Sequence, residues 1–247
     1  MEVIIVKNSA EMGKKAAALI AEEIKRKPDA LLALSTGSSP VGTYQELIRL
    51  HQEEGLDFSR IRALNMDEYV GLNRMHPQGY YYFMEHLLYQ KVNIDKANTF
   101  GPQAAEGNLE EEARKFDEKI EQEGGIDLIL LGIGRDGHIA FNMPAEKLDF
   151  ATHVQELSEL TIRDNARFFD SMDQVPTKAM TIGIQNIFKS KKVVLIAEGI
   201  NKSEIMERFI NSETLDTKIP ATILKLHADI TVILDEAAAA KLEKQNR

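Results

Sequence analysis

Residues 131–144, with the sequence LGIGRDGHIAFNMP, combine the groups best suited to proton transfer. Asp136 and His138 stand two residues apart, directly after an apolar run that predicts a buried strand. A histidine titrates near neutral pH, and a nearby aspartate can orient it or raise its pKa. The three glycines of the segment permit tight turns and close approach of the backbone to a ligand. We therefore predict that Asp136 and His138 take part in acid–base chemistry.

No metal site is predicted from this pattern. Asp-x-His alone is a weak metal-binding signal, and the chain has neither an H-E-x-x-H motif nor a cysteine. The other histidines are expected at the surface, at helix caps or in packed positions: His51, His76, His86, His153 and His227.

A second candidate segment, ALNMDEYVGL at residues 63–72, places the carboxylates Asp67 and Glu68 directly after an apolar strand. A carboxylate in that position can be partly desolvated, which tunes its pKa for work as a general base. The alternative is an ordinary polar turn after a strand. The residues alone leave both interpretations open.

A third segment, ALSTGSSPVGTY at residues 33–44, leaves a predicted strand and enters a predicted helix. Such a loop can direct backbone N–H groups and hydroxyls at an anion, helped by the helix dipole. It is neither a Walker A loop nor a G-x-G-x-x-G motif. The alternative is a turn capped by Ser39, with Pro40 at the first helical position, and both can hold together. The candidate anion ligands are Thr36, Gly37, Ser38, Ser39 and Thr43.

Two cations are further candidates for contact with a phosphate. Arg167 lies in RDNARFF, and Lys202 lies in AEGINKSEI, where it follows a predicted strand and opens a predicted helix. For either residue alone, the alternative is a solvated surface charge.

Short apolar runs alternate with amphipathic stretches along the chain. Strands are expected at residues 3–6, 30–35, 61–66, 126–133, 192–197 and 230–234. Helices are expected at residues 10–26, 41–53, 80–92, 109–123, 178–189, 202–210 and 236–244. This alternation predicts an α/β fold, with residues 1–247 forming a single three-layer α/β/α domain around a mostly parallel, Rossmann-like sheet. Ligands bind such sheets beyond the carboxyl ends of the strands, where the candidate segments lie. Residues 148–176 are the least regular and are expected to form a lid or a loop-rich insertion.

The composition narrows the class of protein. With 43% hydrophobic residues, the 247-residue chain can bury a full core. Its net charge of −9 disfavours a nucleic-acid partner, although a few local donors can still hold a small anion. No apolar run approaches the roughly 20 residues that span a bilayer, and the first residues do not resemble a signal peptide. We expect a cytoplasmic protein with no membrane partner; a homo-oligomer is compatible with these features.

Taken together, the segments resemble the glucosamine-6-phosphate deaminase family. STGSSPVGTYQELI is similar to its phosphate loop, NMDEYVGL with HPQGYYYFM to its catalytic-acid segment, and GIGRDGHIAFN to its ring-opening segment. DNARFF, VPTKAMTIGI, GINKSEI and IPATILKLHADITVILDE continue the match in the same order. The glycine-rich piece by itself is also similar to one in 6-phosphogluconolactonases, so lactone hydrolysis is the competing activity.

The resemblance implies a reaction in which an amino-sugar phosphate is opened, isomerised from aldose to ketose, and loses ammonia. It implies no cofactor. By the same resemblance, Asp67 would move the proton between C2 and C1, and His138 would assist ring opening with Asp136 as its support. The phosphate would be held by Ser38, Ser39, Thr43, Arg167 and Lys202.

The chain departs from the family where it reads FNMP, because the family typically has FNEP. The missing glutamate works with the histidine in ring opening, and the thioether of Met143 cannot transfer a proton. Three interpretations stay open: an enzyme slower in ring opening, an enzyme for a related amino-sugar phosphate, or a phosphosugar-binding homologue without catalysis. Some family members are activated by N-acetylglucosamine 6-phosphate. The surroundings of Glu146, His153 and Gln155 are acidic or neutral, so we expect no such activation here.

Overall fold

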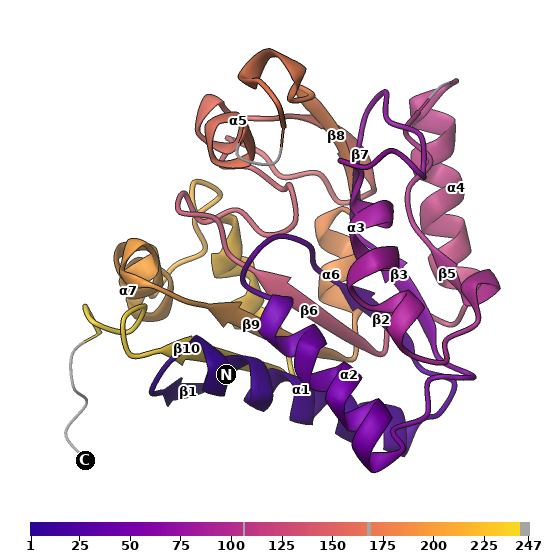
Figure 1. The fold of residues 1–247 in the computed structure, drawn as a ribbon. Coiled ribbons are helices and arrows are strands. Elements are labelled where there is room, and N and C mark those ends of the chain that lie inside the picture. Colours follow the sequence, from indigo (N-terminus) through magenta and orange to yellow (C-terminus); the bar gives the residue numbers. More distant parts are fainter. Residues whose placement is uncertain (106, 167–168, 243–247) are drawn as a thin grey trace.

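The central sheet of this computed structural model, which describes residues 1–105, 107–166 and 169–242, is built from parallel strands. Within those residues seven strands lie in the order β1-β10-β9-β6-β2-β3-β5, and each neighbouring pair is parallel (Figure 1). The strands are β1 (Glu2–Val6), β2 (Leu31–Leu34), β3 (Arg62–Asn65), β5 (Thr99–Phe100), β6 (Leu128–Gly132), β9 (Lys192–Ala197) and β10 (Ile230–Asp235).

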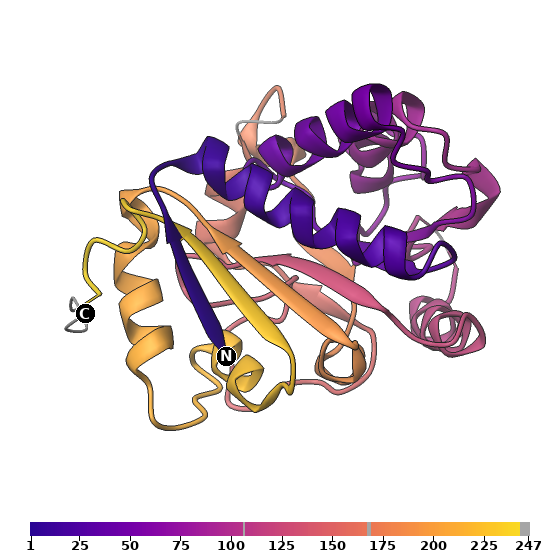
Figure 2. The same cartoon turned by 90° about the horizontal axis from the view of Figure 1, so that it is seen from below.

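Helices cover both faces of this sheet (Figure 2). One face packs against α1 (Ser9–Arg26), α2 (Val41–Glu54) and α3 (Tyr80–Leu87), and the other against α4 (Leu109–Gln122), α6 (Ile184–Lys189) and α7 (Ser203–Asn211). Successive side chains of a strand point to opposite faces, so Leu31 of β2 belongs to the core on the α4 side and Leu32 to the core on the α1 side. Burial on both faces explains why the inner strands β2, β6 and β9 are largely apolar, whereas β1, at the edge of the sheet, is largely exposed. The predicted three-layer, mostly parallel fold is confirmed.

A second, antiparallel sheet lies beside the carboxyl ends of the central strands (Figure 1). It contains β4 (Asp67–Tyr69), β8 (Lys178–Thr181) and β7 (His153–Glu156), with β8 in the middle. The helix predicted over residues 178–189 is therefore wrong in its first part, because β8 is paired on both sides before α6 begins. The stretch 148–176, predicted to be a lid or a loop-rich insertion, contains β7, α5 (Glu159–Asn165) and the short 3-10 helix η4 (Met172–Gln174).

Two other predicted helices differ from the structure. The helix predicted over residues 80–92 ends at Leu87 and continues as the 3-10 turn η1 (Tyr89–Lys91). The helix predicted over 236–244 is a series of turns through residue 242, where the carboxylate of Asp235 accepts the backbone N–H of Ala238 at 2.7 Å. Local bonding of this kind overrides the high helix propensity of the alanine run. Among the described residues, no helix is both long and apolar enough to cross a membrane.

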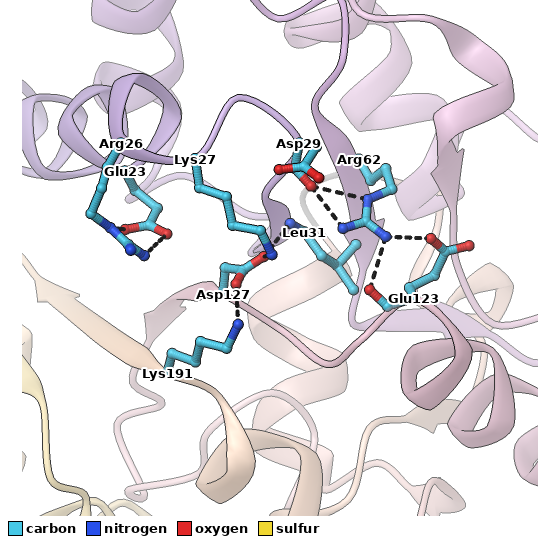
Figure 3. Close-up of polar contacts among 9 residues, drawn as sticks. All are labelled: Glu23, Arg26, Lys27, Asp29, Leu31, Arg62, Glu123, Asp127 and Lys191. Carbon is cyan, nitrogen blue, oxygen red and sulfur yellow. Dashed lines mark hydrogen bonds and ion pairs between the residues drawn. The ribbon is translucent and has the colours of Figure 1, made fainter.

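A buried carboxylate links the loops at the amino ends of three central strands. Asp127, which precedes β6, is fully buried and accepts the backbone N–H of Leu31 at 2.8 Å. Its two oxygens also contact the ammonium groups of Lys27 at 2.7 Å and Lys191 at 2.6 Å (Figure 3). Burial raises the pKa of this carboxyl, but the two lysines and the N–H outweigh it and hold the pKa below its ordinary value. This cluster joins the loops before β2, β6 and β9 at the edge opposite the candidate site.

Candidate active site

The three candidate segments meet at one cavity of about 250 Å³ at the carboxyl ends of the strands. They leave β6, β2 and β3, which are consecutive neighbours in the sheet. Parallel neighbours end at the same edge, so segments that lie far apart in the sequence come side by side. The cavity is lined by residues 35–40 after β2, by Met66 and Asp67 after β3, and by residues 131–136 and His138 around the end of β6.

The loop after β2 supplies small and hydroxyl groups to the cavity. Thr36, Gly37, Ser38 and Ser39 all line it, and Gly37 has a φ of +96°, which favours glycine. The predicted cap is wrong by one residue, because Pro40 occupies the N-cap position of α2 and no side chain caps the helix. The dipole of α2 places partial positive charge at this end of the helix, which favours an anion beside the loop.

Thr43 differs from the other predicted anion ligands. It lies in the first turn of α2, is fully buried, and does not line the cavity. The helix rotates its side chain into the protein, whereas the preceding loop residues face the cavity. This placement corrects the sequence interpretation, which predicted that Thr43 contacts a phosphate.

Of the two cations predicted to contact a phosphate, the structure describes Lys202. Lys202 lines the cavity, and its ammonium group donates to the carbonyl of Ile133 at 2.6 Å, which holds it against the end of β6. Arg135 also lines the cavity, although the sequence analysis did not select it. Arg167 lies outside the residues that the structure describes.

Asp67 and Glu68 point to opposite sides of β4, as consecutive strand residues do. Asp67 lines the cavity. Glu68 is buried and accepts the backbone N–H groups of Tyr80 and Tyr81, each at 3.0 Å, so it caps the start of α3. Of the two carboxylates, only Asp67 is placed to meet a ligand in this cavity.

Burial raises the pKa of Asp67 to about 7. Part of its surface faces the cavity, but the carboxyl is otherwise surrounded by protein, and removal of solvent disfavours the charged form. The hydroxyl of Thr181, which donates to Oδ1 at 2.5 Å, acts against this increase, as does the backbone N–H of Phe141. A carboxyl with a pKa near neutrality can both accept and return a proton.

His138 and Asp136 form a close pair on the other side of the cavity. Nδ1 of His138 lies 2.7 Å from Oδ1 of Asp136, and the same oxygen accepts the backbone N–H of His138 at 3.1 Å. Burial acts to raise the pKa of Asp136, but its contacts with His138 outweigh burial and hold the pKa below the ordinary value. The carboxylate therefore stays ionised beside the ring.

The glycine at position 134 is required by this pair. A Cβ atom there would lie 2.3 Å from Nδ1 of His138 and 2.6 Å from Oδ1 of Asp136, far inside contact distance. Gly137 has a φ of +92°, and a Cβ there would lie 2.8 Å from Cγ2 of Ile219. The spacing G-x-D-G-H thus lets the pair fold back on its own backbone.

Met143 lies behind the cavity wall. Only 6% of it is exposed, and it packs in a cluster with Tyr69, Phe141, Leu157 and Ala179. Glu146, three residues further on, is exposed and does not line the cavity. It does not take the place of the family's glutamate.

Several residues of the site were not found by sequence reasoning. Tyr69 lines the cavity two residues after Asp67, and its hydroxyl accepts from Tyr80 at 2.8 Å and from Asn165 of α5 at 2.9 Å. The two-residue period of a strand could have indicated Tyr69. Nothing in the sequence indicates Thr181, because its contact with Asp67 joins positions 114 residues apart.

Comparison with known proteins identifies the family. A family model for glucosamine-6-phosphate isomerases and 6-phosphogluconolactonase matches residues 7–233. The chain belongs to this family. A glucosamine-6-phosphate deaminase from Clostridium perfringens is 49% identical over 243 residues, covering 98% of this chain and 100% of that protein. One from Thermoanaerobacter pseudethanolicus is 48% identical over 246 residues, covering 100% and 97%.

Solved structures agree with this membership. A structure described as a monomeric glucosamine-6-phosphate deaminase superposes with a TM-score of 0.95 at 41% identity, covering 98% of this chain and 100% of that one. A 6-phosphogluconolactonase from Trypanosoma cruzi has a TM-score of 0.74 at 20% identity, covering 98% and 96%. The latter likeness shows a shared fold.

Proposed function

We propose that the protein is a glucosamine-6-phosphate deaminase, which converts glucosamine 6-phosphate and water to fructose 6-phosphate and ammonia. The observation that carries this proposal is one cavity lined by Asp67, by the Asp136–His138 pair and by an anion-binding loop. Relatives of 48–49% identity over nearly the whole chain support it.

Asp67 would transfer the proton between C2 and C1 of the opened sugar. The transfer needs one group that removes a proton from one carbon and returns it to the next. A pKa of about 7 suits both halves, because neither the charged nor the neutral form is strongly favoured at neutral pH.

His138 would move a proton between the ring oxygen and the anomeric hydroxyl during ring opening, and Asp136 would hold the imidazole in place. Their 2.7 Å contact leaves the other ring nitrogen, Nε2, as the atom able to meet the sugar. Asp136 would also stabilise the imidazolium that forms when the ring takes up a proton.

The loop residues Thr36, Gly37, Ser38 and Ser39 would hold the substrate phosphate together with Lys202. Arg167 is included in this proposal because of the family resemblance alone. Fixing the phosphate orients the sugar between the two proton-transferring groups, and orientation can supply up to roughly 7–11 kcal/mol of rate enhancement.

We propose that the protein is active despite Met143, with a slower ring-opening step than relatives that carry glutamate. Met143 lies behind the wall, and the Asp136–His138 pair is formed without it. A related amino-sugar phosphate as substrate, or phosphosugar binding without turnover, are the alternatives that the thioether leaves. We further propose one domain over residues 1–247; a cytoplasmic location stays a prediction.

The test is release of ammonia and fructose 6-phosphate from glucosamine 6-phosphate by the wild type, Asp67→Asn and Met143→Glu. We expect wild-type turnover and a loss of about 10²- to 10⁴-fold in Asp67→Asn. Turnover by Met143→Glu but not by the wild type would mean that this chain has the family fold and a different activity. Hydrolysis of 6-phosphogluconolactone without ammonia release would favour the lactonase. Size-exclusion chromatography of the same preparations distinguishes a monomer from a homo-oligomer.

A further inference from the structure

The hydroxyl of Thr181 joins the two parts of the candidate site. Thr181 is the last residue of β8 and is fully buried. Its Oγ1 donates to Oδ1 of Asp67 at 2.5 Å and accepts the backbone N–H of Phe141 at 3.0 Å. Phe141 lies three residues after His138 in the ring-opening segment.

We propose that Thr181 is a positioning residue for the reaction, with one hydroxyl that holds both the Asp67 carboxylate and the His138 segment in register. This inference rests on the proposed deaminase function. Thr181 lies behind Asp67 and is not one of the residues that line the cavity, so it acts through Asp67.

The surroundings of the Thr181 hydroxyl favour donation of its proton to Asp67. A threonine hydroxyl carries one proton and two lone pairs. The N–H of Phe141 occupies one lone pair, and the carboxylate accepts the proton. Pairing of β4 with β8 sets Asp67 directly opposite Thr181, so their side chains share one face of the small sheet. Another acceptor, the carbonyl of Ile182, lies 3.5 Å from the hydroxyl, so the 2.5 Å bond to Asp67 is the stronger one.

The donated bond also tunes the carboxylate. A hydrogen bond to the charged form favours that form, so Thr181 counteracts the burial that raises the pKa of Asp67. Loss of the hydroxyl would make the carboxylate harder to ionise and free to rotate. The groups around Asp67 that also titrate or carry charge are Glu68 and Tyr69 on its strand, Tyr80 on α3, and Arg135, Asp136, His138 and Lys202 across the cavity.

The experiment compares Thr181→Val, which keeps the shape and removes the hydroxyl, with Thr181→Ser, which keeps the hydroxyl. For Thr181→Val we expect kcat to fall by about 10- to 100-fold with KM changed less than about twofold. The acidic limb of the kcat/KM profile should move to higher pH. Thr181→Ser should restore most of kcat and return the limb to its wild-type position.

The proposal is overturned if Thr181→Val leaves both kcat and the acidic limb unchanged, or if serine and valine behave alike. If valine does not fold, as judged by circular dichroism, Thr181→Ala replaces it in the same comparison. A wild type without ammonia release rejects the deaminase function instead. In that case a ¹³C NMR titration of the Asp67 carboxyl still decides whether Thr181→Val raises its pKa.

Discussion

The sulfur of Met143 lies 4.0 Å from the hydroxyl of Thr161 and is separated from the cavity by that residue. The relationship explains how an apolar side chain can replace a carboxylate without breaking the cavity wall. Met143 completes the apolar cluster beneath α5, so its role in this structure is packing. The missing carboxylate and the packing gain are two consequences of one substitution.

Met143→Glu should therefore cost stability. It would place a carboxyl among Tyr69, Phe141 and Leu157, where ionisation is disfavoured. We expect the free energy of unfolding to fall by about 1–3 kcal/mol at neutral pH. Urea denaturation at pH 5 and pH 8 measures this loss of stability. The loss should be larger at pH 8, because the carboxyl is then fully ionised in the unfolded chain while its ionisation is disfavoured in the folded one.

Met143→Leu is the matched control, with an expected cost below about 1.5 kcal/mol. A glutamate variant as stable as the leucine variant at pH 8 would contradict this account, because it would mean that the new carboxylate finds a partner or solvent.

Asp67→Asn should stabilise the fold while it removes activity. With a folded pKa of about 7 against about 3.9 when unfolded, Asp67 binds a proton more tightly in the folded state. Its ionisation therefore lowers stability as pH rises from about 4 to about 7, by up to roughly 4 kcal/mol. Asparagine carries no such penalty.

The measurement is Tm of wild type and Asp67→Asn across that pH range. The variant should gain over the wild type with rising pH and level off above pH 7. Glu68→Gln is the comparison on the same strand: it weakens the cap of α3 and should lower Tm. Because the charge of Glu68 raises the pKa of Asp67, this variant should also move the acidic limb of the activity profile to lower pH. A pH-independent difference for Asp67→Asn would show that Asp67 ionises normally.

Gly134→Ala should disable ring opening without unfolding the protein. The added Cβ would displace the imidazole of His138 from Asp136, because it lies 2.3 Å from the ring. We expect a loss of about 10²-fold or more in turnover. Gly132→Ala is the comparison, since a Cβ there meets no protein atom within 4 Å and enters the cavity instead.

The two glycine variants are distinguished by steady-state kinetics. Gly134→Ala should lower kcat by separating His138 from Asp136, whereas Gly132→Ala should act mainly on KM. Equal effects of the two variants on kcat would refute the steric argument.

Asp127→Asn should destabilise the protein and leave the substrate KM unchanged. The substitution removes the charge shared by Lys27 and Lys191 at the edge of the sheet opposite the cavity (Figure 3). We expect a loss of about 3 kcal/mol at pH 7. Because the folded pKa is depressed, the contribution of Asp127 is present above about pH 4 and disappears as pH falls below it.

Asp29→Asn is the matched control for that change. Asp29 lies at the same edge, but its carbonyl, and not its carboxylate, accepts from Arg62 at 2.7 Å. Urea denaturation at pH 7 and pH 3 should separate the two variants more at pH 7 than at pH 3. An equal loss in both would mean that Asp127 contributes no more than a surface charge.

Much of this protein could be predicted from its sequence. Continuous apolar strands alternating with amphipathic helices determined the parallel, three-layer fold, because only strands buried on both faces need that pattern. The glycines and the acid–histidine pair of residues 131–144 marked the end of β6 as a place for chemistry. The order of the motifs along the chain indicated the family.

Tertiary structure decided the rest, because burial and long-range pairing are not local properties. The strand β8 sits where the sequence predicts a helix, since pairing with β4 and β7 outweighs local preference. The same pairing brings Thr181 to Asp67 and turns Glu68 away from the cavity. Thr43 and Ser38 belong to one motif. The point at which α2 begins determines that Ser38 faces the cavity and Thr43 faces the protein interior. Met143 is a departure in the sequence, and its packing behind Thr161 exists only in three dimensions.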